Sequence, residues 1–532
     1  MDLGQRTQAA YDLLPEVSSR PTRPTWRHRL ATGLLGLLSL LLVAGAVSGV
    51  WYERWWTSEM GFRAATAQAP VSTVQEALWT EAADAARMAG AGVGAAPVVL
   101  SYHDIDDGSS ASEYVVSART FARQMEMLDR AGYHTLSQDQ LVGYLRGSYV
   151  PAPRSAVITF DDGTRGLYTH ADKVLERHGF QGVSFLISGV VGTKAPYYLT
   201  WAQVDWMQES GRWSFGGHTH DTHAQQTNAS GRTVHSALTS PIRTPSGELE
   251  TFAQFTARIE RDQRLAFGDF AEHGLPRPSL FAWPFSEVQP EGPNTRYANA
   301  VHKLLNEQYA ATLVNSASPL PADRGRSTQL PVQRLEVMDT TTADELFTQM
   351  AQMQALPLTT ARPAASDTWM QPWSSRPVPM TGTDGLRPAG PPAGSVPVDW
   401  RPQQTSTWTG YRVSATLTGL GEGRVGLRAR VGSHDQVTVS ATRDSVRVER
   451  IDRLTVDPEP RGRDHDVTTG KQLRVSIEVR PDVTVVTFGG HRKVLEVVPG
   501  NDATGGPGLY FFAEEGGHAW PQVRDLQVTS LP

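Results

Sequence analysis

Between residues 98 and 356, short apolar runs alternate with segments whose apolar residues recur at helical spacing. Phe121, Met125 and Leu128 show the helical spacing, whereas residues 98–102 form a short apolar run. By these patterns strands are predicted over 98–102, 156–160, 183–187, 213–215, 280–283 and 310–314, and helices over 166–178, 201–209, 252–273 and 296–307. This alternation predicts an α/β fold with a parallel sheet or barrel, in which catalytic groups gather at the carboxyl ends of the strands.

The pattern changes in the last third of the chain. Residues 357–397 are rich in Pro, Gly, Ser and Thr, which predicts a linker. Short strands with turns between them are then predicted over 411–417, 424–431, 436–441, 445–450, 472–479, 483–488 and 509–512. Residues 398–532 are therefore expected to form an all-β sandwich or jelly roll.

The N-terminal region contains one long uncharged apolar segment, residues 31–51. About 20 such residues can span a bilayer as a helix. Four arginines precede the segment, namely Arg20, Arg23, Arg27 and Arg29, which favours a cytoplasmic tail over residues 1–30. We therefore expect a single-pass membrane protein with a stalk over 52–96 and an extracellular catalytic domain. The alternative is a secreted protein whose signal peptide is cleaved near Ala44-Gly45-Ala46, although the leader is long for a signal peptide.

Composition narrows the chemistry that is open to the chain. It has no cysteine, which excludes disulfides and thiol catalysis, so any metal site must use His, Asp or Glu. The net charge of −6 argues against nucleic acid as a partner, because a phosphate-binding surface usually carries a basic excess.

Two polar motifs follow predicted strands. Asp161 and Asp162 end one strand, and Gly163 permits a sharp turn that exposes both carboxylates. After another strand, residues 218–223 contain three histidines, which core packing does not explain. Neutral imidazole is the commonest metal ligand in proteins, and two histidines with one carboxylate leave coordination positions open for water. The motifs therefore indicate a catalytic metal site rather than an ordinary polar turn.

Thr159-Phe160-Asp161-Asp162-Gly163, together with the histidine motif, resembles the NodB-homology polysaccharide deacetylases, carbohydrate esterase family 4. The resemblance covers about residues 97–356 and implies a distorted (β/α) barrel. His218 and His223 are five residues apart, and Trp283-Pro284-Phe285 follows a strand. Both features resemble the subgroup that deacetylates poly-β-1,6-N-acetylglucosamine.

The resemblance implies that Asp161 is the general base and that Asp162, His218 and His223 bind one divalent metal ion (Zn, Ni or Co). It further implies removal of N-acetyl groups from an extracellular N-acetylhexosamine polymer, with poly-β-1,6-N-acetylglucosamine as the expected substrate, in exopolysaccharide and biofilm maturation. Polysaccharide synthase or export proteins would then be partners. The alternatives are deacetylation of peptidoglycan or another amino-sugar polymer, and a catalytically weak polysaccharide-binding protein on the same fold.

The last alternative depends on two departures from the family pattern. The family arginine that orients the base has no match near Trp283, and no histidine matches the usual general acid. Six further residues are candidates for substrate binding or for support of the metal ligands: His103, Asp104, His220, Trp283, Phe285 and Glu336. Trp283 in particular is expected to stack on a sugar. The C-terminal region weakly resembles concanavalin-like or laminin-G-like jelly rolls, which bind carbohydrate or serve only as packing domains.

Overall fold

The computed structural model describes residues 77–81 and most of residues 96–531. The gaps in the second range are 108–111, 228–232, 289–294, 317–318, 320–321, 323–330, 355, 357, 359, 373–376, 434, 453–460, 467–469, 499–503, 516 and 518.

The structure does not support the prediction of a membrane-anchored protein. None of the described helices is both long and apolar enough to cross a bilayer. The segment 31–51, from which the anchor was predicted, lies outside the described residues, as do the tail and most of the stalk.

Seven parallel strands close into a barrel in the order β1, β12, β11, β10, β7, β6, β5, and β5 pairs again with β1. The short strand β4 pairs in parallel with the first two residues of β5. Their bounds are β1 (Val98–Tyr102), β4 (His134–Thr135), β5 (Ser155–Phe160), β6 (Gly182–Leu186), β7 (Trp213–Gly217), β10 (Leu280–Ala282), β11 (Ala311–Ser316) and β12 (Val332–Glu336). The predicted α/β barrel is therefore confirmed, and β12 is a strand that the apolar pattern did not reveal.

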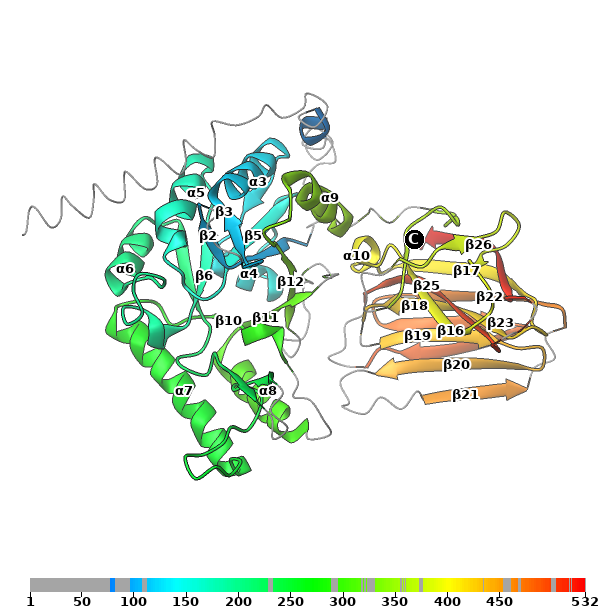
Figure 1. Ribbon diagram of the computed structural model, residues 1–532. Coiled ribbons are helices and arrows are strands. Elements are labelled where there is room, and N and C mark those ends of the chain that lie inside the picture. Colours follow the sequence, from blue (N-terminus) through cyan, green and yellow to red (C-terminus); the bar gives the residue numbers. More distant parts are fainter. Residues whose placement is uncertain are drawn as a thin grey trace, which may run out of the picture. The chain divides into compact units, whose positions relative to one another are not determined.

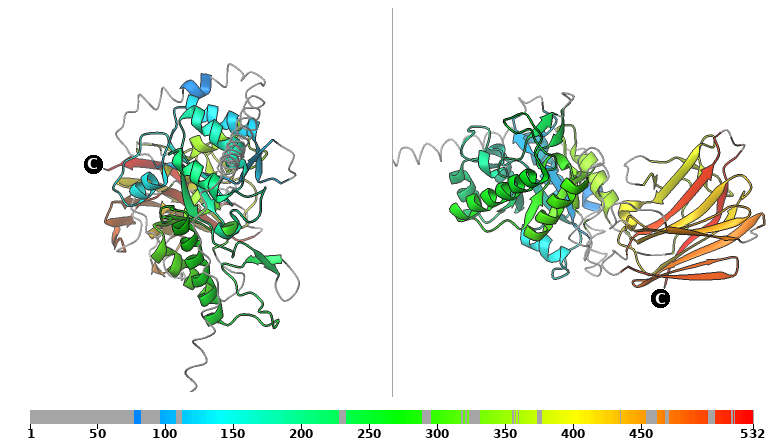
Figure 2. Two further views of the ribbon diagram at one scale, coloured as in Figure 1. Left: turned by 90° about the vertical axis from the view of Figure 1, so that its left-hand side faces the viewer. Right: turned by 90° about the horizontal axis from the view of Figure 1, so that it is seen from below.

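Helices surround the barrel (Figures 1 and 2). They are α3 (Ala118–Arg130), α4 (Gln138–Leu145), α5 (Asp172–His178), α6 (Trp201–Glu209), α7 (Phe252–Glu272), α8 (Thr295–Gln308) and α9 (Ala343–Met353). Four of these helices begin with a capping box, in which a Ser or Thr and a Gln or Glu three residues later satisfy each other's backbone N–H groups. The capping residues are Ser137, Thr200, Thr251 and Thr342.

Smaller elements connect these units. They are β2 (Asp104–Asp106), β3 (Val115–Ser117), a π-helical turn (Leu167–Ala171), two 3-10 turns (Ser188–Val190 and Pro284–Ser286), and the hairpin of β8 (Gln225–Thr227) and β9 (Thr233–Ser236).

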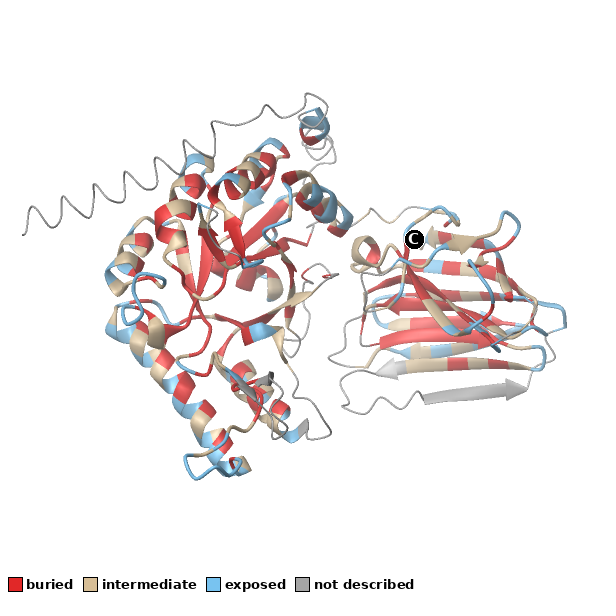
Figure 3. Cartoon of the chain, viewed as in Figure 1, coloured by how far each residue is buried: buried red, intermediate tan, exposed pale blue. Residues whose placement is uncertain are grey.

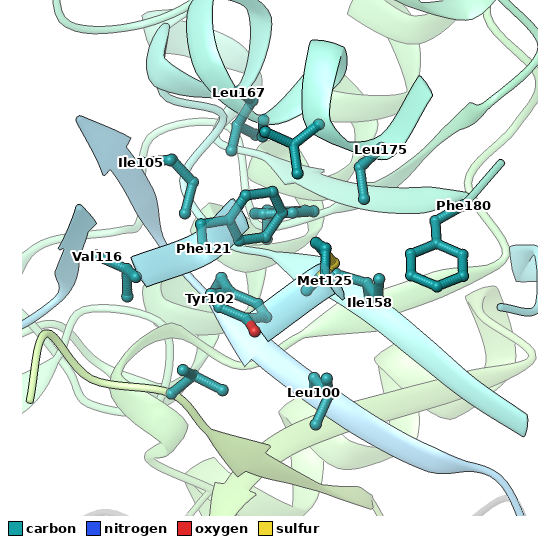
Figure 4. Packing of buried hydrophobic residues seen from close by; sticks show 14 of the residues in the cluster. Leu100, Tyr102, Ile105, Val116, Phe121, Met125, Ile158, Leu167, Leu175 and Phe180 are labelled. Carbon is teal, nitrogen blue, oxygen red and sulfur yellow. The ribbon is translucent and has the colours of Figure 1, made fainter. Parts of the chain in front are cut away.

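Alternation along each strand divides the barrel's apolar residues into two sets. Val99 and Val157 lie in a cluster with Val183 and Leu313 that fills the barrel interior. The intervening residues, such as Leu100, Tyr102 and Ile158, pack against the surrounding helices (Figure 4). Buried residues accordingly dominate the barrel strands (Figure 3). Continuous apolar strands are expected where a parallel sheet is covered on both faces. The packing on both faces fixes the positions of the carboxyl ends of the strands.

The C-terminal region is all-β, as predicted, and consists of two antiparallel sheets visible as layers in the right-hand view of Figure 2. One sheet contains β13 (Trp369–Met370), β16 (Gly394–Trp400), β25 (Gly506–Ala513), β18 (Arg424–Val431), β19 (Asp435–Ala441), β20 (Ser445–Asp452) and β21 (Arg461–Asp466). The other contains β24 (His491–Glu496), β23 (Val483–Phe488), β22 (Gln472–Val479), β17 (Tyr411–Thr418) and β26 (Gln522–Ser530).

The range 357–397 is more than the predicted linker, because it contributes strands and core residues to this all-β region. Besides β13 and most of β16, it contains the small pair β14 (Met380–Thr381) and β15 (Arg387–Pro388). Trp369 is buried in the sandwich core together with Trp400 and Trp408, which flank the short helix α10 (Pro402–Thr405). The free energy gained by burying the indole of Trp369 against the sheet favours an ordered strand here, even though the Pro- and Gly-rich composition is typical of a linker.

Candidate active site

The two carboxylates at the end of β5 sit on a left-handed turn. Asp162 has a φ of 74° and Gly163 a φ of 72°, so two successive residues adopt a conformation that L side chains rarely occupy. A Cβ atom on Gly163 would lie 2.8 Å from Cδ2 of Leu186, so the side chain of Leu186 would have to shift to admit it. This turn separates the directions of the carboxylates: Asp161 is buried, whereas Asp162 is partly exposed.

Two histidines face Asp162. The Nε2 atoms of His218 and His223 each lie 3.4 Å from Oδ1 of Asp162. On the far side of its ring, Nδ1 of His218 lies 2.7 Å from the carbonyl oxygen of Ala282. A hydrogen bond donated to this carbonyl fixes the tautomer and leaves Nε2 with a lone pair directed at Asp162.

This arrangement fits a divalent metal ion. One ligand atom from each of Asp162, His218 and His223 lies within 4.8 Å of the other two. Oδ1 of Asp162 is buried, yet it has no hydrogen-bond partner among the described residues. A cation coordinated by this buried carboxylate oxygen and the two facing imidazole nitrogens would satisfy all three atoms.

The pKa shifts of Asp162 and His223 agree with a metal site. Burial would raise the pKa of Asp162, but His218 and His223 outweigh burial and lower it. Burial is the largest cause that lowers the pKa of His223 to about 4, so its imidazole is neutral at pH 7. Burial would also lower the pKa of His218, but the neighbouring carboxylates of Asp162 and Asp161 outweigh burial and raise it. A metal needs an ionised carboxylate and neutral imidazoles as ligands.

Arg334 holds Asp161, and the sequence patterns did not reveal this arginine. Its two terminal nitrogens donate to the two carboxylate oxygens of Asp161 at 2.6 and 2.7 Å. Both side chains are buried, and Arg334 also donates to Oγ1 of Thr159 at 3.2 Å. Burial alone would raise the pKa of Asp161, but the guanidinium charge and its two hydrogen bonds lower the pKa well below its usual range. No arginine matches the family pattern near Trp283, and the arginine that contacts Asp161 lies on β12 instead.

These groups open into one pocket of about 590 Å³, which also contains most of the other predicted residues. His103 lines it, and its buried Nδ1 has no partner among the described residues. Glu336 lines it from the end of β12 and accepts a hydrogen bond from Nδ2 of Asn315 at 2.6 Å. Asp104 accepts hydrogen bonds from Oγ1 of Thr164 at 2.6 Å and from the N–H of Ile105 at 2.9 Å, so it braces the turn after Asp162.

Trp283 is not placed where a sugar could stack on it, whereas the ring of Phe285, two residues later, is exposed. Trp283 is only 1% exposed and packs among Phe281 and Val301, so no sugar can stack on it. Phe285 is 46% exposed, with its ring centroid 4.6 Å from that of His223. Its φ of 56° turns the ring out of the core after the buried Trp283.

His220, the middle histidine of the motif, does not line the pocket. Its Nδ1 lies 2.8 Å from a carboxylate oxygen of Asp269 on α7 and 3.3 Å from Oγ of Ser188. The side chain of His220 therefore contacts α7 and Ser188 instead of the pocket.

The barrel and this site together define an enzyme domain with a His₂Asp centre suited to a divalent metal. Residues 149–304 match the sequence profile of the family described as polysaccharide deacetylase. The chain therefore contains a polysaccharide deacetylase domain, and the resemblance inferred from the motifs is confirmed.

Relatives with that activity in their names are similar to part of the chain. The poly-β-1,6-N-acetyl-D-glucosamine N-deacetylase of Escherichia coli K12 is 27% identical over 207 residues, which are 36% of this chain and 31% of that protein. The protein of that name from Staphylococcus epidermidis is 32% identical over 114 residues, 21% of this chain and 39% of that protein. The chain thus matches these relatives over less than half of their own length. Among solved structures, the BpsB deacetylase domain from Bordetella bronchiseptica aligns with a TM-score of 0.39 at 22% identity, over 46% of this chain and 97% of that chain.

Proposed function

We propose that the chain removes N-acetyl groups from an amino-sugar polymer in a metal-dependent reaction, and that the polymer is poly-β-1,6-N-acetylglucosamine. The observation that carries this proposal is the placement of the Asp162, His218 and His223 triad beside the Arg334-held Asp161 in one pocket. The choice of polymer rests on the names of the relatives from Escherichia coli and Staphylococcus epidermidis. A role in exopolysaccharide maturation, with synthase or export proteins as partners, is part of the same proposal.

Asp162, His218 and His223 would hold the metal, for which Zn, Ni and Co all suit the donor set. When bound, such an ion polarises the acetamide carbonyl and lowers the pKa of a water molecule. Asp161 stands next to this triad as an ionised carboxylate with a fixed orientation. In the proposed reaction it accepts the proton of the attacking water. Because Arg334 lowers the pKa of Asp161 and so weakens it as a base, its advantage lies in its fixed position.

His103 is the proposed proton donor to the leaving nitrogen. It lines the same pocket as Asp161 and Asp162, on the strand end of β1 that pairs with β5. Imidazole is the side chain most often used for proton transfer. The sequence motifs did not identify the general acid that this role requires. The transfer would release acetate and leave a free amine on the sugar.

Exposed aromatic side chains at the rim of the pocket favour a sugar as the substrate. Four aromatic side chains among the described residues are strongly exposed: Tyr114, Tyr197, Phe285 and Phe512. The first three line this pocket. Exposed aromatic rings that gather at one cavity mark a binding surface, and their flat faces suit pyranose rings.

Acetate release from defined oligosaccharides tests the proposal. Wild-type chain and Asp161→Asn are incubated with β-1,6-linked N-acetylglucosamine oligomers, peptidoglycan fragments and a β-1,4-linked control, after metal loading. We expect release from the β-1,6 oligomers by the wild type alone. Equal release by both proteins would refute the assignment of Asp161, and preference for peptidoglycan fragments would refute the choice of polymer. Stoichiometric metal binding without release from any substrate would favour the binding-protein alternative.

A further inference from the structure

The loop between the two histidine ligands is bound by one carboxylate on α7. Asp262 is 2% exposed, and its Oδ1 accepts the backbone N–H groups of Asp221 at 2.8 Å and Thr222 at 3.0 Å. The N–H of His220 lies 3.2 Å from both carboxylate oxygens. Three consecutive N–H groups of the segment that joins His218 to His223 therefore converge on one side chain.

This carboxylate is itself fixed in place. Nε2 of Gln263 donates to Oδ2 of Asp262 at 3.1 Å, and the hydroxyl of Tyr309 donates to Oε1 of Gln263 at 2.8 Å. Tyr309 in turn occupies the space that a side chain on Gly217 would need, since its hydroxyl lies 2.6 Å from the position of that Cβ. The network therefore extends to the residue that immediately precedes His218.

A second contact joins the same helix to the same loop. Asp269 lies two turns beyond Asp262 on α7, and it holds the imidazole of His220 at 2.8 Å. On the opposite side, the N–H of Gly189 donates to the carbonyl of His220 at 3.1 Å. Thr219 adopts a φ of 74°, a conformation that a β-branched residue takes only when its surroundings impose it. The course of the backbone between the ligands is thus set by these contacts rather than by its own preference.

We infer that Asp262 is a positioning residue of the metal centre, whose three backbone hydrogen bonds hold His218 and His223 at the separation that a divalent ion requires. The inference rests on the proposed metal-dependent function. It goes beyond that function because it attributes part of the metal affinity to Asp262, which is not itself a metal ligand. Groups that orient metal ligands typically contribute about 10- to 100-fold to metal affinity. Nothing in the six-residue motif reveals Asp262, which is separated from Asp221 by 41 positions.

The test measures metal affinity directly, by competition with a chromophoric chelator, for Co²⁺ and Zn²⁺ on the full chain. Asp262→Ala leaves three loop N–H groups without their acceptor, and we expect its affinity to fall about 10- to 100-fold. Asp262→Asn keeps a neutral acceptor and should show a smaller fall, because charge-assisted hydrogen bonds are about twice as strong as neutral ones. Glu260→Ala, an exposed position on the same helix, is the matched control and should bind as the wild type does.

Two further readouts separate positioning from general damage to the fold. The visible spectrum of the Co²⁺-loaded protein reports ligand geometry, and we expect it to change in Asp262→Ala and to stay unchanged in Glu260→Ala. Excess metal should restore much of the lost acetate release while leaving KM for the oligosaccharide unaltered. Wild-type affinity and spectrum in a folded Asp262→Ala would overturn the inference. If that variant does not fold, wild-type affinity in Asp262→Asn overturns it instead. Absence of stoichiometric metal from the wild type would refute the proposed function.

Discussion

Replacing Arg334 by methionine tests the most buried charge pair of the site. Methionine is of similar length, so the change removes the guanidinium while leaving most of the volume filled. In the wild type, Arg334 is fully buried and Asp161 is 3% exposed, with the two hydrogen bonds between them at 2.6 and 2.7 Å. The variant therefore leaves a carboxylate in the barrel interior without its counter-charge.

The expected loss follows from that burial. Removing one partner of a buried ion pair costs about 3–5 kcal/mol of the free energy of unfolding, because the remaining charge is uncompensated. The loss should depend on pH. In the wild type the pKa of Asp161 is lowered, so the pair contributes stability above the pKa of an unfolded Asp, about 4, which is lost as pH falls. In Arg334→Met, burial is opposed only by the smaller effects of His218 and His103, so we expect the pKa of Asp161 to rise and protonation to stabilise the folded variant as pH falls. The difference between the two proteins should therefore shrink from pH 7 to pH 4.

The assay must report the barrel rather than the all-β region, because a single unfolding transition is not expected of a chain with more than one folded part. Pulsed hydrogen exchange along a urea titration, read on peptides that cover β5 and β12, reports the barrel alone. The double variant Asp161→Asn/Arg334→Met should lose less stability than the two single variants added together, by about 1–3 kcal/mol. Additive losses, or a loss for Arg334→Met that is the same at pH 4 and pH 7, would refute the role given to the pair.

Three smaller changes test other parts of the site. Gly163→Ala should destabilise the barrel by about 2–4 kcal/mol in the same exchange assay, because it combines a left-handed backbone with a clash against Leu186; a loss under 1 kcal/mol would contradict the geometry. His103→Gln should lower kcat for acetate release about 10²- to 10⁴-fold with metal affinity unchanged, and an unchanged kcat would exclude it as the proton donor. Phe285→Ala should raise KM for oligosaccharides several-fold without changing Tm, since the ring is exposed; equal KM values for both proteins would remove it from the sugar-binding rim.

The barrel could be predicted from the sequence because its strands are apolar on both faces and its helices begin at strong local signals. The strand that was missed shows the limit of that reasoning. In β12, Val332 and Leu335 are buried apolar residues, but Gln333, Arg334 and Glu336 make the segment polar overall. Apolar periodicity cannot distinguish such a strand from a loop, because two of its polar side chains are directed at the site rather than at solvent. The linker prediction failed for the converse reason, since local composition did not reveal that Trp369 is buried by distant strands.

The same distinction applies within the site. The triad of Asp162, His218 and His223 could be predicted because its parts are local: Asp162 belongs to a turn motif, and the two histidines belong to one loop. The pair of Asp161 and Arg334 spans 173 positions and exists only through strand register. Leu100 on β1 pairs with Ile158 on one side and with Leu335 on the other, so β5 and β12 flank the same strand. Residues two apart on a strand share a face, which places Thr159 with Asp161 and Arg334 with Glu336 on the interior side. An arginine on β12 can therefore orient Asp161 without belonging to any contiguous motif, and for this reason the sequence near Trp283 does not reveal it.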